Sequence, residues 1–130
     1  MSNAWKSFED FLNIGWGKRA TRYLKEGAAF KVLVDKEPFS LSMLEGKMKM
    51  SPEDPEQHDV LIEISSSAIE FLSSAKTEDE AQERLGELIY HPTSKKYARM
   101  KIEAKPTKEG SIDFYWMGYY FWARRMRFAS

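Results

Sequence analysis

Two histidines are the side chains best suited to acid–base chemistry in this sequence. His58 follows a polar loop and precedes a predicted strand, and His91 stands before Pro92 at the predicted end of a helix. An imidazole can act as a general base near neutral pH. Neither histidine belongs to a recognisable motif, and a favourable charge at a helix C-terminus explains His91 equally well. We interpret both as surface residues and predict no catalytic residue and no enzymatic activity.

A serine run and an acidic cluster also have simpler explanations than catalysis or metal binding. Ser65, Ser66 and Ser67 lack the flanking glycines of a GxSxG nucleophile elbow, and serine is a preferred helix N-cap. Acidic residues near a helix N-terminus stabilise the helix. The acidic cluster comprises Glu78, Asp79, Glu80, Glu83 and Glu87. The sequence has no Walker or GxGxxG phosphate loop, so we predict no metal and no cofactor.

The composition indicates one globular domain spanning residues 1–130. Lysine plus arginine and aspartate plus glutamate balance at 20 each, which argues against a nucleic-acid partner because such binding needs an excess of basic residues. There is no cysteine, so disulfides and thiolate sites are excluded. No apolar stretch is long enough to span a membrane, and we expect a soluble cytoplasmic protein. The opening Met1-Ser2-Asn3-Ala4 is typical of residues left by an expression vector.

Hydrophobic periodicity predicts helices followed by strands. Alternation with period two predicts strands at 28–34, 39–44, 47–50, 59–64 and 97–104, joined mostly by short turns. Apolar residues three and four apart predict helices at 5–25, 67–74 and 77–90. Gly15 and Gly17 also allow the first helix to be two short ones, broken near 13–17. We therefore predict an α+β fold whose five-stranded, mainly antiparallel sheet is covered on one face by helices.

The segment 113–128, DFYWMGYYFWARRMRF, is the most unusual part of the chain. Eight of its sixteen residues are aromatic, so it must be buried in the core, a ligand, a membrane or a partner. Steps of three and four residues, as between Tyr115, Tyr119 and Trp122, favour a helix, although a strand is also allowed. A helix that is apolar nearly all round is buried on more than one side.

Methionines on the predicted strands add to this apolar character. Methionine packs adaptably, which suits a pliable pocket, and an apolar cavity stays dry and holds hydrophobic molecules. We predict a hydrophobic ligand between the last helix and the opposing elements. The predicted lining residues are Phe114, Met117, Phe121 and Trp122, with Met43, Leu61, Ile69 and Leu72 opposite. Arg124 and Arg125 are predicted to hold a headgroup.

The order and spacing of these segments resemble the sterol carrier protein 2 family of lipid-transfer domains. The segments that carry the resemblance, as they stand in this sequence, are WKSFEDFLN (5–13), AFKV (29–32), FSLSMLEGKM (39–48), DVLIEIS (59–65), AIEFL (68–72) and ARMKIE (98–103). The resemblance implies a five-stranded sheet covered by helices on one face. It also implies an apolar tunnel walled by the last helix, with no shared catalytic residues. The implied ligands are fatty acyl chains, sterols or other lipids.

Two other functions remain open from the residues. The aromatic segment is also suited to a homodimer or partner interface, because interfaces are enriched in Tyr, Trp, Phe, Met and Arg. In that case the chain would be a structural or interaction module. Trp and Tyr beside Arg124, Arg125 and Arg127 would also suit transient contact with a membrane surface.

Overall fold

The computed structural model describes residues 4–56, 58–90, 100–104, 118, 122 and 127–128. Helix α1 (Ala4–Asn13) is followed by α2 (Gly15–Thr21), so the alternative of two short helices is confirmed. Ile14, between them, has an extended backbone with φ −99° and ψ 173°, which interrupts the helical hydrogen-bond ladder. Gly15 and Gly17 weaken helix formation at the same place.

The strands follow the predicted alternation closely. They are β1 (Ala29–Val34), β2 (Glu37–Leu44), β3 (Lys47–Ser51), β4 (Val60–Ile64), β5 (Met100–Ala104) and β6 (Arg127–Phe128). Every second residue of β1 is buried, namely Phe30, Val32 and Val34, and the residues between them are half-buried. This is the pattern of strands with one face in the core.

The sheet is mixed, with the strand order β3-β2-β1-β4-β5-β6. Neighbours β1–β2, β2–β3 and β4–β5 are antiparallel, whereas β1–β4 and β5–β6 are parallel. The sequence predicted five mainly antiparallel strands, because short turns suggested consecutive hairpins. The longer connection between β3 and β4 instead carries the chain to the free edge of β1, where Phe30 aligns with Val60 and Val34 with Ile64.

Helices α3 (Ser66–Ser73) and α4 (Glu78–Tyr90) begin at the predicted caps. The Ala68 N–H donates to Ser65 Oγ at 3.1 Å, and the Glu80 N–H donates to Thr77 Oγ1 at 3.1 Å. The Arg84 guanidinium joins the two helices, because it donates to the Phe71 carbonyl oxygen at 2.7 Å and lies 5.0 Å from the centre of the Phe71 ring. The α+β fold class is therefore as predicted.

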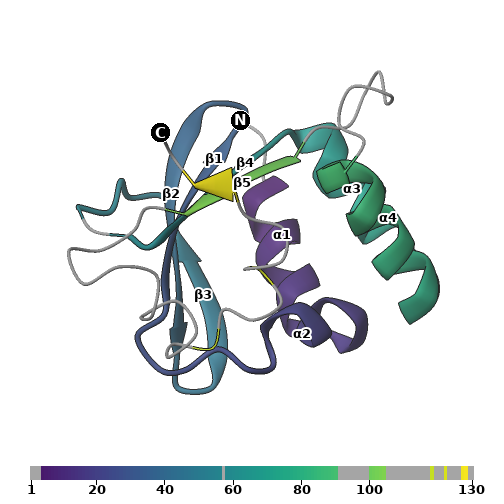
Figure 1. Cartoon of the computed structure of the whole chain (residues 1–130), viewed down its shortest axis with the longest axis horizontal. Coiled ribbons are helices and arrows are strands. Elements are labelled where there is room, and N and C mark those ends of the chain that lie inside the picture. The colour runs from purple at the N-terminus through teal and green to yellow at the C-terminus, as the bar shows by residue number, and fades with distance from the viewer. Residues whose placement is uncertain are drawn as a thin grey trace.

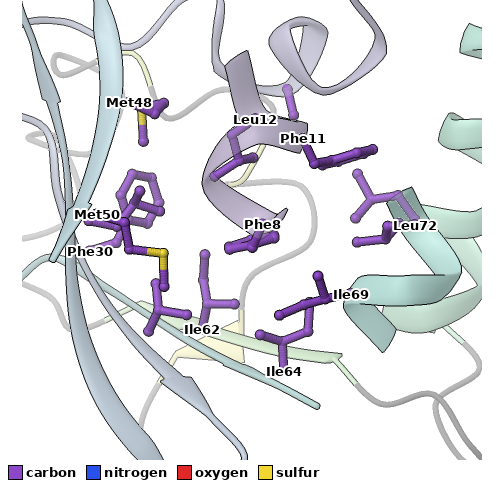
Figure 2. Packing of buried hydrophobic residues seen from close by; sticks show 14 of the residues in the cluster. Phe8, Phe11, Leu12, Phe30, Met48, Met50, Ile62, Ile64, Ile69 and Leu72 are labelled. Atoms are coloured by element: carbon purple, nitrogen blue, oxygen red, sulfur yellow. The ribbon is translucent and has the colours of Figure 1, made fainter. Parts of the chain in front are cut away.

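All four helices lie on the same side of the sheet (Figure 1). The inner face of the sheet packs against α1, and α1 packs in turn against α3 (Figure 2). Phe8, Phe11 and Leu12 of α1 are only 1 to 4% exposed and occupy the middle of this core. Helix α4 adds Leu85 and Leu88 to the same apolar cluster.

Side chains of α1 bind the outer edge of the sheet. Strand β3 is an edge strand, so Met48 and Met50 would present unpaired backbone groups. Asn13 Oδ1 accepts from the Met48 N–H at 2.9 Å, and Asn13 Nδ2 donates to the Met48 carbonyl oxygen at 2.8 Å. Glu9 Oε2 accepts from the Met50 N–H at 2.7 Å. The helix thereby supplies the hydrogen bonds that a further strand would make, and it protects this edge from pairing with another chain.

Replacing Asn13 by alanine is expected to lower the free energy of unfolding by about 2 kcal/mol, because both Met48 backbone groups lose their partners. Urea unfolding followed by circular dichroism measures this difference. Ser7→Ala is the matched control, since Ser7 is exposed on the same helix and the change brings a comparable gain in helix propensity. The control should stay within about 0.5 kcal/mol of the unchanged chain. Equal effects of the two substitutions would show that the Asn13 bonds contribute nothing to stability.

Candidate functional site

Three methionines form the sheet side of the layer between β3 and α1. Met43 of β2 lies directly opposite Met48 of β3, and Leu41 lies opposite Met50. Met43, Met48 and Met50 are 8, 2 and 6% exposed. Figure 2 shows Met48 and Met50 beside Phe30, facing the side chains of α1. Because methionine is unbranched and flexible, this part of the wall can repack around molecules of different shape.

Ile69 and Leu72 of α3, both predicted to line the site, are also in this apolar cluster. They are 1% and 0% exposed. Figure 2 shows Phe8 and Phe11 of α1 between these two residues and the methionines of β3. The predicted lining residues of α3 therefore share a core with Met43, but α1 lies between them.

The prediction missed α1 as the central wall. Its apolar stripe, which includes Phe8 and Leu12, was readable from the sequence as a helix face. Its contact with the inner face of β3 depends on the bonds from Glu9 and Asn13, whose partners are 41 and 35 residues away. Pairings at such separations leave no local pattern in the sequence.

Trp122 is the one predicted lining residue of the aromatic segment that the structure describes. Its side chain is 1% exposed, and its ring meets Phe30 of β1 edge-on, with centroids 5.5 Å apart and planes at 65°. This geometry is favourable for an aromatic pair. At Trp122, the aromatic segment therefore belongs to the domain's own core. Phe114, Met117, Phe121, Arg124 and Arg125 lie outside the described residues, so their predicted roles stay predictions.

A continuous helix through the aromatic segment is wrong at two places. Gly118 has φ +87°, in the left-handed region, so a regular helix cannot pass through it. An added Cβ there would lie 1.7 Å from the Tyr23 carbonyl oxygen, which shows how closely the segment approaches the chain after α2. Arg127 and Phe128 form β6, which pairs with Glu103 and Ala104 of β5.

Leu61 does not join the other predicted lining residues. Val60, Ile62 and Ile64 are buried on the inner face of β4, so the alternation of the strand places Leu61 on the opposite face. Leu61 lies beside Lys31 of β1, whose Nζ is 3.0 Å from Asp54 Oδ1. The prediction chose Leu61 for its size and overlooked the period of its own strand.

The serines near α3 serve structural roles. Ser65 caps the helix, and the Ser66 backbone N–H donates to Asp35 Oδ1 at 3.0 Å. The Ser66 hydroxyl also bonds to the Asp35 carboxylate. This network joins the β1–β2 turn to the start of α3.

The described acidic residues do not assemble a metal site. Glu78 pairs with Arg19 at 2.9 Å, and Glu80 pairs with Arg84 on its own helix. Across the described parts of the chain, no three acidic, histidine or cysteine side chains are grouped so that they could hold a metal ion. His58 is half-buried just before β4, and His91 lies outside the described residues. The described helices include none with the length and hydrophobicity that crossing a membrane requires.

Gly118→Ala is expected to destabilise the protein by about 3 kcal/mol or more, because a methyl group would meet the Tyr23 backbone. Gly46→Ala is a matched control. Gly46 also has a positive φ, +77°, but nothing lies within 4 Å of an added Cβ. That substitution should cost only about 1 kcal/mol of backbone strain. Thermal and urea unfolding of both variants measures the difference, and equal costs would contradict the docking of the aromatic segment against Tyr23.

No protein-family model matches this chain, and no curated protein matches its sequence.

Proposed function

We propose that the chain binds or transfers a hydrophobic ligand without catalysing a reaction. The ligand would be a lipid, a fatty acyl chain or a sterol-like molecule, held between the inner face of the sheet and the helices. The observation that carries the proposal is the cluster of Met43, Met48 and Met50 beneath α1. Flexible thioether side chains over an otherwise apolar layer allow a guest to enter by local repacking.

The arrangement of strands and helices supports the sterol-carrier-like architecture that we expect from the sequence. Strands β1 to β5 would be its five main strands, with helices over one face. Trp122 and its neighbours would close the site opposite Phe30. Arg124 and Arg125 would bind the polar end of the ligand. We place this activity in the cytoplasm, where a chain without cysteine needs no disulfide to fold.

Apolar burial would supply the binding energy. Each methylene group transferred from water to the site contributes about 0.8 kcal/mol. A long acyl chain therefore gains enough to displace the weaker contacts of a few core side chains. The ligand must also separate α1 from the sheet in part, so affinity should depend on how readily the methionines move.

The interaction module is the second candidate function. The observation that favours it is the near-complete burial of the inner layer, where Phe30, Leu41, Ile62 and Leu72 are all 0% exposed. A core filled by its own side chains needs no ligand. Under this alternative, the mass in sedimentation equilibrium should rise with protein concentration, and added lipid should leave the core unchanged.

Titration with a long-chain fatty acid is expected to shift the methyl NMR signals of Met43, Met48 and Met50 in methionine-labelled protein. Met43→Ala should weaken affinity about tenfold, because it removes contact equivalent to roughly two methylene groups. Leu61→Ala is the control, since Leu61 lies on the other face of the sheet. Met43→Leu, which nearly conserves volume, tests whether flexibility matters apart from stability.

The proposal fails if saturating ligand leaves all three methyl signals unchanged in folded protein. It also fails if Leu61→Ala weakens binding as much as Met43→Ala does, because the ligand would then lie on the wrong face. Circular dichroism of each variant separates loss of binding from loss of fold.

A further inference from the structure

Three exposed apolar side chains gather near the turn between β2 and β3. Ile14, Tyr23 and Leu44 are 46, 58 and 41% exposed. They belong to three segments: the joint between α1 and α2, the chain after α2, and the end of β2. Figure 1 shows α2 and the turn between β2 and β3 at the same end of the molecule.

Hydrogen bonds fix these segments against one another. The Glu45 N–H of the turn donates to the Glu26 carboxylate, at 2.9 Å from Oε1 and 3.0 Å from Oε2, and Glu26 lies three residues after Tyr23. Asn13, next to Ile14, binds the backbone of Met48. The three apolar side chains are thus held around one hairpin by bonds that the core does not supply.

Basic residues surround the same apolar side chains. The exposed cations are Lys18, Arg22, Lys25, Lys47 and Lys49. The acidic residues in the same segments are Glu26 and Glu45, and Glu26 is engaged by the Glu45 backbone. Arg19 is neutralised by Glu78 of α4. This end of the molecule is therefore positive, although the whole chain has a formal charge of zero.

We propose that this hairpin-end surface, formed by Ile14, Lys18, Arg22, Tyr23, Lys25, Leu44 and Lys47, docks on a bilayer rich in anionic phospholipid. Tyrosine prefers the boundary between headgroups and acyl chains, and isolated apolar side chains can insert there. Lysine and arginine are attracted to the negative surface potential. The surface is distinct from the aromatic segment and does not depend on the proposed ligand site.

Charge complementarity selects this partner. Apolar side chains that project separately, with cations between them, suit a fluid and negatively charged surface better than a flat protein interface, which needs a continuous apolar centre. The attraction should weaken as salt rises, because the groups involved are exposed.

Co-sedimentation with vesicles tests the proposal on the full chain. Vesicles of phosphatidylcholine mixed with phosphatidylserine should bind the protein, and vesicles of phosphatidylcholine alone should bind it much less. Lys47→Glu should reduce binding to the mixed vesicles at least about fivefold, since each cation near the surface contributes at about that level. Tyr23→Ser should weaken binding while leaving its salt dependence in place.

Lys36→Glu is the matched control. Lys36 is an exposed lysine in the turn between β1 and β2, at the other end of β2, so its reversal changes the net charge equally. Binding should be nearly unchanged in this variant. Equal loss in Lys36→Glu and Lys47→Glu, or no binding of the unchanged chain to the mixed vesicles, would overturn the proposal.

Sedimentation equilibrium without vesicles covers the other occupant. A dimer that Tyr23→Ser dissociates would assign the surface to a second copy of this chain and overturn membrane docking. Vesicle binding and the fatty-acid titration have separate readouts. Docking without any methionine shift would leave this proposal standing and refute the proposed function, and the reverse result would refute docking alone.

Discussion

The fold depends on how the outward backbone groups of β3 are satisfied. An edge strand must pair with another strand, with water or with side chains, and here Asn13 and Glu9 provide the partners. Because both residues are on α1, the same bonds fix the position of that helix along the sheet. Phe8 and Leu12 are then directed into the core, and α3 packs on α1 from the other side. One set of polar contacts therefore sets the spacing of the whole apolar layer.

The same arrangement defines what a ligand would have to do. A guest beside Met43, Met48 and Met50 would compete with the apolar face of α1. The polar bonds to β3 can remain while the side chains below them repack, because they join the helix to the rim of the sheet and not to its centre. A pliable wall beneath a fixed helix would explain why three methionines occur on two adjacent strands.

Local sequence patterns predicted the parts of the fold that depend on local physics. Alternation located β1 to β4 because each buries one face, and Ser65 and Thr77 marked helix starts because their hydroxyls satisfy free N–H groups. The parallel pairing of β1 with β4 depends on where a polar loop carries the chain, which periodicity does not encode. Gly118 read as part of a helix, although its left-handed φ and its contact with Tyr23 interrupt one. The site prediction included Leu61, on the outer face, and omitted α1, whose position is set by contacts distant in sequence.

Native mass spectrometry tests the central claim of a hydrophobic ligand most directly. The purified chain would be incubated with a mixture of fatty acids, phospholipids and sterols and then separated from free lipid. The account predicts a species heavier by one ligand, whose identity follows from its mass and from extraction into organic solvent. A folded chain that stays at the mass of the protein alone, at every lipid concentration, would contradict the account and leave the apolar layer as a filled core.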